Sequence, residues 1–277
     1  MNVNSGRFGF ALRLILILIA VIAALFPFFW MLRTSIVPPD EVYSLGLNVL
    51  PNRVTLANYL RAWEDAHLGR AVLNGLIVTF GILLFQLLTV IPAAFAFAKL
   101  RFRGRNALFL AVVASLLVSS QVTAVPNYIT LSAIGLVNTR LGLILPFATS
   151  AFGIFLIRQY LISTPPALLE AARMDGLSMF KTMLLIYIPV ARPAIAAFAV
   201  FSFVVHWNDY LWPLLVARSA EIHTPALALA IFNNAEVGRD FGALTAGAAI
   251  VTIPAIIAFL LAQQNFVEGI SGGEIPG

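Results

Sequence analysis

The sequence contains no cysteine, and only 10% of its 277 residues are Asp, Glu, Lys or Arg. Without thiols, disulfide bonds and Cys-ligated metal sites are excluded. A soluble globular domain carries about 25% charged residues, whereas this chain is 61% hydrophobic and has a mean hydropathy of +0.95. We therefore expect most of it to face lipid or other apolar helices, in the all-α fold of a polytopic membrane protein.

Negative charge is scarcer than positive charge: 12 acidic residues stand against 17 Lys and Arg, a formal net charge of +5. Such an excess is ordinary for a membrane protein, whose basic residues gather at span ends because of topology rather than phosphate binding. We therefore expect no nucleic-acid partner. The three histidines, His67, His206 and His223, lack the spacing of metal ligands, so we expect no metal site.

Long apolar runs dominate the chain instead. Each is close to the ~20 residues that a helix needs to cross the hydrocarbon core. The first run ends in Phe28-Phe29-Trp30, which is typical of an interfacial aromatic belt and favours an uncleaved span over a signal peptide. Together the runs predict a single transmembrane domain over residues 1–277, with six spans at about 12–32, 72–98, 107–125, 141–160, 193–214 and 242–266.

The orientation of these spans follows from one basic loop. Lys99, Arg101, Arg103 and Arg105 follow the second run with no acidic residue among them. By the positive-inside rule this loop is cytoplasmic. Two spans precede it and four follow it, so we expect the N- and C-termini to be cytoplasmic as well.

A polar segment at 163–190 separates the fourth and fifth runs on the same predicted side. Ser163-Thr164-Pro165-Pro166 is typical of a helix start, with a hydroxyl cap and a tolerated proline. Residues 167–174 then form about two turns, and Gly176 lies where a left-handed C-terminal cap is expected. A second helix begins near Ser178. The segment is thus predicted to be a short helix-turn-helix parallel to the membrane.

The spacing within this segment resembles a known motif. Glu170-Ala171-Ala172, Gly176 and the run Ile186-Tyr187-Ile188-Pro189 match the pattern E-A-A-x3-G-x9-I-x-L-P of bacterial ABC importer permeases, except that Ile188 replaces Leu. In that family this loop docks as a coupling helix into a cleft of the ATPase subunit. The resemblance therefore implies ATPase coupling through a set of six residues: Glu170, Ala171, Ala172, Asp175, Gly176 and Pro189.

Other stretches are similar to the carbohydrate-uptake branch of these permeases, the maltose and glycerol-3-phosphate type. They are Thr55-Leu56-Ala57-Asn58-Tyr59, Asn74 at the start of the second span, and the stretch Trp207-Asn208-Asp209-Tyr210-Leu211-Trp212-Pro213-Leu214. The chain looks like the second permease of each pair. Gly75 departs from the pattern, because the family usually has Ser there.

The chain has no G-x4-G-K-[ST] loop to hold phosphates, so it cannot power transport itself. The resemblance implies a sister permease in a heterodimer, two ATPase subunits or domains that bind ATP and Mg, and a periplasmic solute-binding protein. The chain itself would need no cofactor. It would be a multi-pass protein of the bacterial inner membrane, surrounded by lipid.

Small polar side chains inside the spans are candidates for the solute path. Ser115, Ser119, Thr123 and Asn127 recur every four residues and would share one face of the third helix, while Gln86 lies in the second. Such residues often only join helices to one another. Both interpretations stay open on the sequence alone.

His206, Trp207, Asn208 and Asp209 are a sharper candidate. Ionisable groups inside a span are costly and suggest function, and aromatic faces beside hydrogen-bonding groups suit a sugar. The alternative is an aromatic belt at the outer end of the fifth helix, with Asp209 in water and Asn208 as a cap.

These features favour a permease subunit, without catalytic residues, that imports a sugar or polyol-like solute by alternating access. A glycoside or a glycerol phosphate falls within that class. A secondary transporter or channel would need mid-span coupling charges or an inverted repeat, and neither is visible in the sequence. An intramembrane enzyme built on His206 and Asp209 would need a nucleophile or metal constellation, which we do not find.

Overall fold

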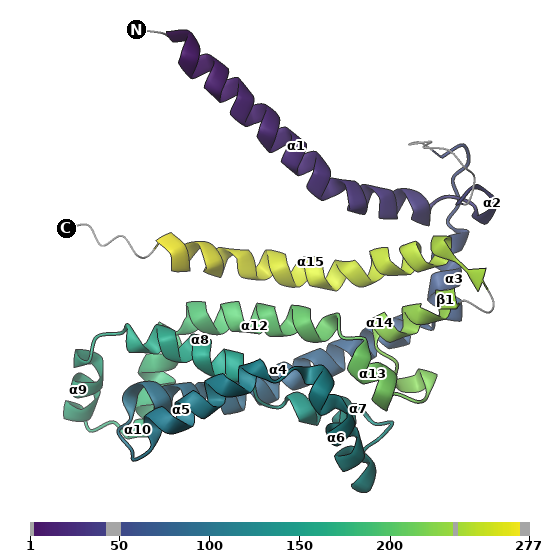
Figure 1. Ribbon diagram of the computed structural model, residues 1–277. Coiled ribbons are helices and arrows are strands. Elements are labelled where there is room, and N and C mark those ends of the chain that lie inside the picture. Colours follow the sequence, from purple (N-terminus) through teal and green to yellow (C-terminus); the bar gives the residue numbers. More distant parts are fainter. Residues whose placement is uncertain (1–2, 43–50, 235–237, 272–277) are drawn as a thin grey trace. The chain divides into compact units, whose positions relative to one another are not determined.

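The computed structural model describes residues 3–42, 51–234 and 238–271, and these are almost entirely helical (Figure 1). The all-α prediction is therefore confirmed. The chain divides into two compact units. Unit 1 comprises residues 1–68 and 229–252, and unit 2 comprises residues 69–228 and 253–277.

Unit 1 is built around three helices: α1 (Val3–Ser35), α3 (Ala57–Asp65) and the first part of α15 (Phe241–Ser271). No residue in the most apolar part of α1 is buried within the chain, as expected of a helix that faces lipid. The smaller elements of the unit are α2 (Pro39–Val42), η5 (Leu229–Phe232), and the antiparallel pair β1 (Asn233–Asn234) and β2 (Gly238–Arg239).

Asn58, from the Thr55–Tyr59 stretch, joins the end of α1 to α3. Its side-chain nitrogen donates to the carbonyl oxygens of Ser35 at 2.9 Å and Val37 at 2.8 Å. Its side-chain oxygen accepts from Arg61, which also pairs with Asp240. Asn58 is fully buried, so these bonds satisfy a polar group that would otherwise be costly. This stretch of sequence is therefore structural.

Unit 2 holds α4 (Leu68–Lys99) from Gly69 onward, together with a series of shorter helices. Its remaining elements, in chain order, are α5 (Arg105–Ala114), η1 (Ser115–Leu117), α6 (Ser120–Ala133), α7 (Arg140–Ile144), η2 (Leu145–Phe147), α8 (Ala151–Ile162), α9 (Ala167–Met174), α10 (Met179–Thr182), the π-helical turn η3 (Met183–Tyr187), α11 (Ile188–Val190), α12 (Arg192–Trp207), α13 (Leu211–Val216), η4 (Ala220–Ile222) and α14 (Pro225–Ala228).

Among the described residues, three helices are long and apolar enough to cross a membrane, and up to six spans result if each bent helix pair counts as one. The bent pairs are residues 105–117 with 120–133 at 99°, 140–147 with 151–162 at 44°, and 179–190 with 192–207 at 78°. The boundaries of the six spans stay a prediction, but the continuous third helix is wrong.

The third helix breaks because Val118 and Ser119 are extended, with ψ of 113° and 141°. The Ser119 side chain accepts a bond from the backbone N–H of Gln121 and so caps α6. Serine competes well for this role, because its oxygen satisfies an N–H that has no partner within the helix. Ser115 and Asn127 therefore do not share one straight helical face.

The N-terminal end of α4 is fixed by Asn74. Its side-chain oxygen accepts from Nε and Nη2 of Arg140 at 3.1 and 2.9 Å, and its nitrogen donates to the carbonyl oxygens of Glu221 and His223. Gly75 lies beside it in close packing. A Cβ atom at Gly75 would lie 2.6 Å from Cδ of Pro225, which explains why no larger residue is present.

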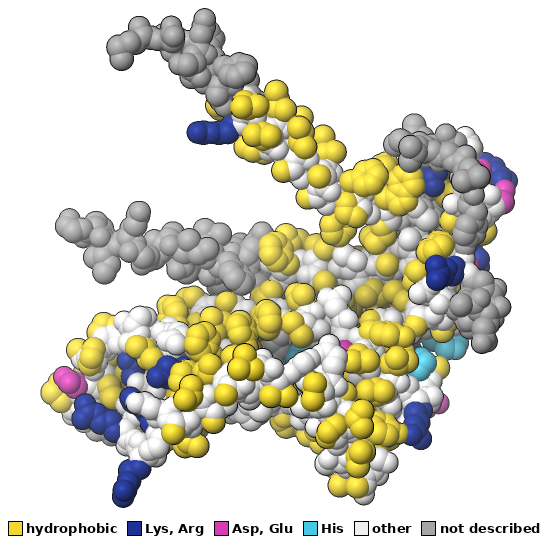
Figure 2. Space-filling model, in the orientation of Figure 1, with side chains coloured by type: hydrophobic (Ala, Val, Ile, Leu, Met, Phe, Trp, Pro, Cys, Tyr) yellow, Lys and Arg dark blue, Asp and Glu magenta, His cyan; other side chains and the backbone are white. Residues whose placement is uncertain are grey.

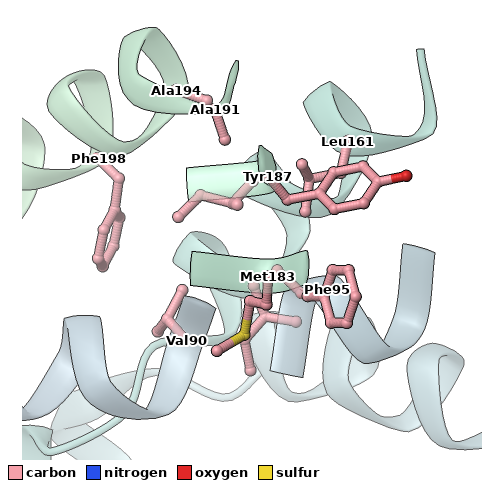
Figure 3. Packing of buried hydrophobic residues seen from close by; sticks show 11 residues of the cluster. Val90, Phe95, Leu161, Met183, Tyr187, Ala191, Ala194 and Phe198 are labelled. Atoms are coloured by element: carbon pink, nitrogen blue, oxygen red, sulfur yellow. The ribbon is translucent and has the colours of Figure 1, made fainter. Parts of the chain in front are cut away.

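One core cluster of unit 2 is shown in Figure 3. It brings together side chains from α4, α8, η3 and α12, among them Val90, Leu161, Met183, Tyr187 and Phe198. All are at most 5% exposed. This packing attaches the segment that follows α10 firmly to the long helices.

Candidate functional site

The α9 segment ends in a Schellman motif centred on Gly176. The N–H of Gly176 donates to the carbonyl oxygen of Arg173 at 3.1 Å, and that of Leu177 donates to Ala172 at 3.0 Å. Gly176 has φ of +70°, a conformation that costs little only without a Cβ. The predicted left-handed cap is thus confirmed. It accounts for the spacing between Glu170 and the glycine of the motif, because Gly176 must closely follow the end of α9. Ser178 then caps α10 by accepting from Lys181 N–H.

The predicted hydroxyl cap at the start of α9 is wrong. The Ser163 hydroxyl donates to Tyr160 O and the Thr164 hydroxyl to Leu161 O, both at 2.7 Å, so each closes the end of α8 instead. Pro166 precedes α9 without a side-chain cap. Hydroxyl side chains can bond back to carbonyls three residues earlier, and here those carbonyls were the nearer partners.

The six residues expected to couple to an ATPase differ in exposure. Glu170, Ala171, Asp175, Gly176 and Pro189 are exposed. Ala172 is only 1% exposed, so it packs inward and cannot be touched by a partner.

Two apolar side chains that the motif does not include are also exposed on this segment, Met174 at 82% and Phe180 at 66%. Hydrophobic residues in an otherwise polar loop were the signal that could have found them. Figure 2 shows Lys and Arg side chains gathered at the end of unit 2 that carries α9 and α10, with an acidic side chain beside them. Exposed basic residues include Arg101 and Arg103 in the loop after α4, Arg173 in α9 and Lys181 in α10.

Behind this surface, η3 connects the segment to α4. The rings of Tyr187 and Phe95 lie 5.2 Å apart between centroids. Nζ of Lys99, the last residue of α4, donates to the carbonyl oxygen of Thr164 at 3.0 Å and lies 5.3 Å from the Tyr187 ring. Both ends of the α9–α10 segment therefore contact the same end of α4.

A cavity of about 460 Å³ lies within unit 2. This volume falls in the usual range for small-molecule sites, roughly 300–1,000 Å³. Its walls come from α4, the start of α6, the break between η2 and α8, α12, and the residues that follow α12. The breaks that bend the helices are thus also what opens the cavity.

A chain of hydrogen bonds crosses one wall of the cavity. The Ser202 hydroxyl donates to Oε1 of Gln86 at 2.6 Å, and Nε2 of Gln86 lies 3.3 Å from Nε2 of His206. Gln86 and Ser202 are each 3% exposed. The ring of Phe147 lies 4.9 Å from that of His206 between centroids. Asp209 lines the same cavity and accepts from the backbone N–H of Trp212 at 3.4 Å.

The structure brings some of the predicted path residues together and separates others. Gln86, Thr123, Asn127, His206 and Asp209 line the cavity, while Ser115 and Ser119 are not among its lining residues. The sequence also missed several polar and aromatic members of the wall: Ser120, Gln121, Thr149, Ser150, Ser202, Phe147 and Phe201.

Trp207 and Asn208 lie outside the cavity wall. Trp207 is 1% exposed and stacks on Phe203, with centroids 5.6 Å apart at an interplanar angle of 10°. Asn208 ends α12 and donates to the carbonyl oxygen of Val204 at 2.8 Å. The cap predicted for Asn208 is therefore present, and Trp207 contributes to packing.

Within residues 3–42, 51–234 and 238–271, no three His, Asp or Glu side chains are grouped so that they could hold a metal ion. The site is therefore made of amide, hydroxyl, imidazole, carboxylate and aromatic groups. Such groups bind polar solutes through hydrogen bonds and ring stacking.

The family described as binding-protein-dependent transport system inner membrane component matches residues 5–272. The arabinooligosaccharides transport system permease protein AraQ of Halalkalibacterium halodurans is 30% identical over 261 residues, which cover 92% of each chain. The diacetylchitobiose uptake system permease protein NgcG of Streptomyces coelicolor is 30% identical over 273 residues, or 98% of this chain and 90% of that protein. The sn-glycerol-3-phosphate transport system permease protein UgpE of Agrobacterium fabrum is 30% identical over 266 residues, covering 92% and 94%.

Among solved structures, a chain of a bacterial ABC transporter involved in the import of the acidic polysaccharide alginate has a similar fold. It aligns with a TM-score of 0.84 at 25% identity, over 96% of this chain and 99% of that one. A chain from a structure of a bacterial alginate ABC transporter in complex with an alginate pentasaccharide-bound periplasmic protein aligns with a TM-score of 0.67 at 18% identity, over 94% of each chain.

Proposed function

The chain belongs to the family of binding-protein-dependent transport system inner membrane components and is a permease subunit of an ABC importer, and on this basis we propose that it carries a carbohydrate or polyol-like solute through the cavity of unit 2. The permease is not catalytic, and ATP is hydrolysed by a separate chain. We further propose that movement of that ATPase reaches the cavity through α9 and α10.

The observation that carries the coupling proposal is the pairing of an exposed docking surface with a buried attachment. Glu170 and Asp175 offer carboxylates, and Met174 and Phe180 offer apolar area that water would otherwise cover. Behind them, Met183 is 5% exposed within the core cluster of Figure 3. A displacement of the surface would move close-packed side chains, which transmit strain rather than absorb it.

The path from that surface to the cavity runs along α4. Lys99 at one end of α4 holds Thr164, and Gln86, thirteen residues earlier on the same helix, lines the cavity. The chain stays helical across Pro92 from Gln86 to Lys99, so a shift at Lys99 would reposition Gln86 and its partners Ser202 and His206. In the proposed mechanism, α4 is the element whose two positions would give alternating access.

The solute class is supported by the cavity wall and by the relatives. The wall combines the faces of Phe147, Phe201 and Trp212 with amide and hydroxyl groups, and sugars present both apolar C–H faces and hydroxyls. The names of related permeases include an arabinooligosaccharide, diacetylchitobiose and sn-glycerol 3-phosphate. The cavity wall suits a carbohydrate or polyol derivative, and the solutes in the relatives' names belong to the same class.

The importer would be assembled with a sister permease in a heterodimer, two ATPase subunits or domains that bind ATP and Mg, and a periplasmic solute-binding protein. The chain would cross the bacterial inner membrane six times with both termini in the cytoplasm. The basic residues around α9 and α10 support this orientation, because Lys and Arg are enriched in cytoplasmic loops.

The test is purification of the full-length chain from its own membranes in mild detergent. A partner with a phosphate-binding Walker loop and measurable ATP hydrolysis should be recovered with it. Glu170→Lys should reduce the recovered ATPase at least severalfold, because it reverses a charge on the proposed docking surface. Glu64→Lys is the matched control, since Glu64 is an exposed glutamate of α3 in unit 1. Recovery of the wild-type chain without an ATPase, or equal recovery in both variants, would contradict the proposal.

A further inference from the structure

The described wall of the cavity carries a carboxylate but no Lys or Arg side chain. Of the described residues that line it, none is Lys or Arg, and Asp209 is the single carboxylate. The remaining polar groups are amides and hydroxyls, together with the imidazole of His206. An anion that enters such a site loses its water without gaining a cation.

The basic residues of unit 2 near the cavity-bearing helices are engaged elsewhere. Arg140 makes two bonds to Asn74, and Arg218 bonds to the hydroxyl of Tyr128. Arg158 donates to the carbonyl oxygen of Phe97, and its guanidinium lies 3.7 Å from the centre of the Phe109 ring. None of these side chains is among the residues that line the cavity.

The hydrogen bonds around His206 do not favour a positive charge on its ring. Oε1 of Gln86 already accepts from the Ser202 hydroxyl at 2.6 Å, so Gln86 turns its NH₂ group toward the ring. That group lies 3.3 Å from Nε2 of His206, which accepts in this arrangement. A charged imidazolium has donors at both nitrogens and would place two donors face to face. The hydrogen bonds of this wall therefore match a neutral ring rather than an imidazolium.

We propose that this cavity admits neutral, hydroxyl-rich solutes and excludes anionic ones such as sugar acids and phosphorylated polyols. The proposal rests on the proposed role of the cavity as the solute path. Amides and hydroxyls satisfy sugar hydroxyls as donors and acceptors, whereas an anion would find no cation in the wall to offset its lost hydration and would be repelled by Asp209. The relatives are named for both neutral and anionic solutes. Their names therefore do not decide between a neutral and an anionic solute, and the proposal rests on the wall of this chain's own cavity.

The test uses the natural absence of cysteine in the chain. Thr123→Cys places one thiol in the cavity wall on α6, and Ser132→Cys places one on an exposed position of the same helix, outside the wall. The assembled transporter in membrane vesicles is labelled with a cationic trimethylammonium methanethiosulfonate and with an anionic sulfonate analogue of similar size. Ser120→Cys serves as a second wall position if Thr123→Cys assembles poorly.

The cationic reagent should label Thr123→Cys about threefold or more faster than the anionic one, after division by the ratio at Ser132→Cys, since a nearby charge changes local ion concentration by this order. Asp209→Asn should remove most of that preference, while its amide oxygen can still accept from Trp212 N–H. Equal rates, or faster reaction of the anionic reagent, would contradict the exclusion of anions but not the role of the cavity as the solute path.

Two further results would also be decisive. If neither reagent reached the wall cysteines while Ser132→Cys reacted, the cavity would not be a water-filled path, and the proposed path would fail together with its selectivity. If the vesicles took up sn-glycerol 3-phosphate, the path would stand and the exclusion of anions would fall.

Discussion

Nζ of Lys99 donates a 3.0 Å hydrogen bond to the carbonyl oxygen of Thr164, and so joins the last residue of α4 to the chain just before α9. The two residues are 65 positions apart in sequence. One end of this contact belongs to the helix that lines the cavity, and the other to the segment that carries Glu170. In the proposed mechanism, this contact would transmit a movement of α9 to the helix that lines the cavity.

Lys99→Met should lower solute uptake several-fold without lowering the amount of assembled complex. Methionine keeps most of the apolar stem but removes the ammonium, and a hydrogen bond from a charged donor contributes about 1.5–3 kcal/mol. Uptake per assembled complex is the measurement. Arg101→Met is the control, since Arg101 is exposed in the adjacent loop. An equal effect of both substitutions would point to general loss of positive charge instead.

Gly75→Ser should destabilise unit 2 by roughly 1–3 kcal/mol, the usual cost of overpacking. The added Cβ would lie 2.6 Å from Cδ of Pro225 and 3.0 Å from the Trp207 ring. Thermal unfolding of the purified chain in detergent measures the effect. Pro225→Ala in the same chain should recover part of the lost stability, and a double substitution no better than Gly75→Ser alone would show that the contact with Pro225 is not the cause.

Trp207→Ala should act on stability rather than on the solute path. Trp207 is 1% exposed and stacks on Phe203, so its truncation should cost about 3–5 kcal/mol. Asp209→Asn is the comparison, because it changes charge without removing volume and should leave the unfolding temperature nearly unchanged. If the Trp207→Ala chain unfolded like the wild type but lost transport, Trp207 would belong to the solute path rather than to the packing.

Local features of the site could be predicted from the sequence, because they depend on few neighbouring residues. The left-handed Gly176 and the helix start near Ser178 follow from turn and cap chemistry within one or two helical turns. The long helices α1, α4 and α15 follow from their apolar length.

Features that depend on competing partners could not be predicted. Ser119 ends one helix and caps the next within an apolar run, which a period of 3.6 residues does not reveal. Thr164 had a choice of carbonyl or N–H partners, and only the fold decides between them. Likewise, nothing local distinguishes Trp207, which packs inside, from His206 one residue before it, which lines the cavity.

The most direct test of the central claim, that α9 and α10 couple this permease to an ATPase, compares the same substitution at two glycines. Gly176 and Gly135 have φ of +70° and +71°, and neither would bring a new Cβ within 4 Å of another atom. Valine should therefore impose a similar backbone strain, of order 1–2 kcal/mol or more, at both positions.

Only Gly176 lies in the coupling segment, whereas Gly135 follows α6. Uptake and ATP hydrolysis, both divided by the amount of assembled complex, are the quantities to measure. If α9 and α10 couple the permease to the ATPase, Gly176→Val should abolish uptake while ATP is still hydrolysed, and Gly135→Val should transport normally. Normal uptake by Gly176→Val, or equal loss in both variants, would contradict it.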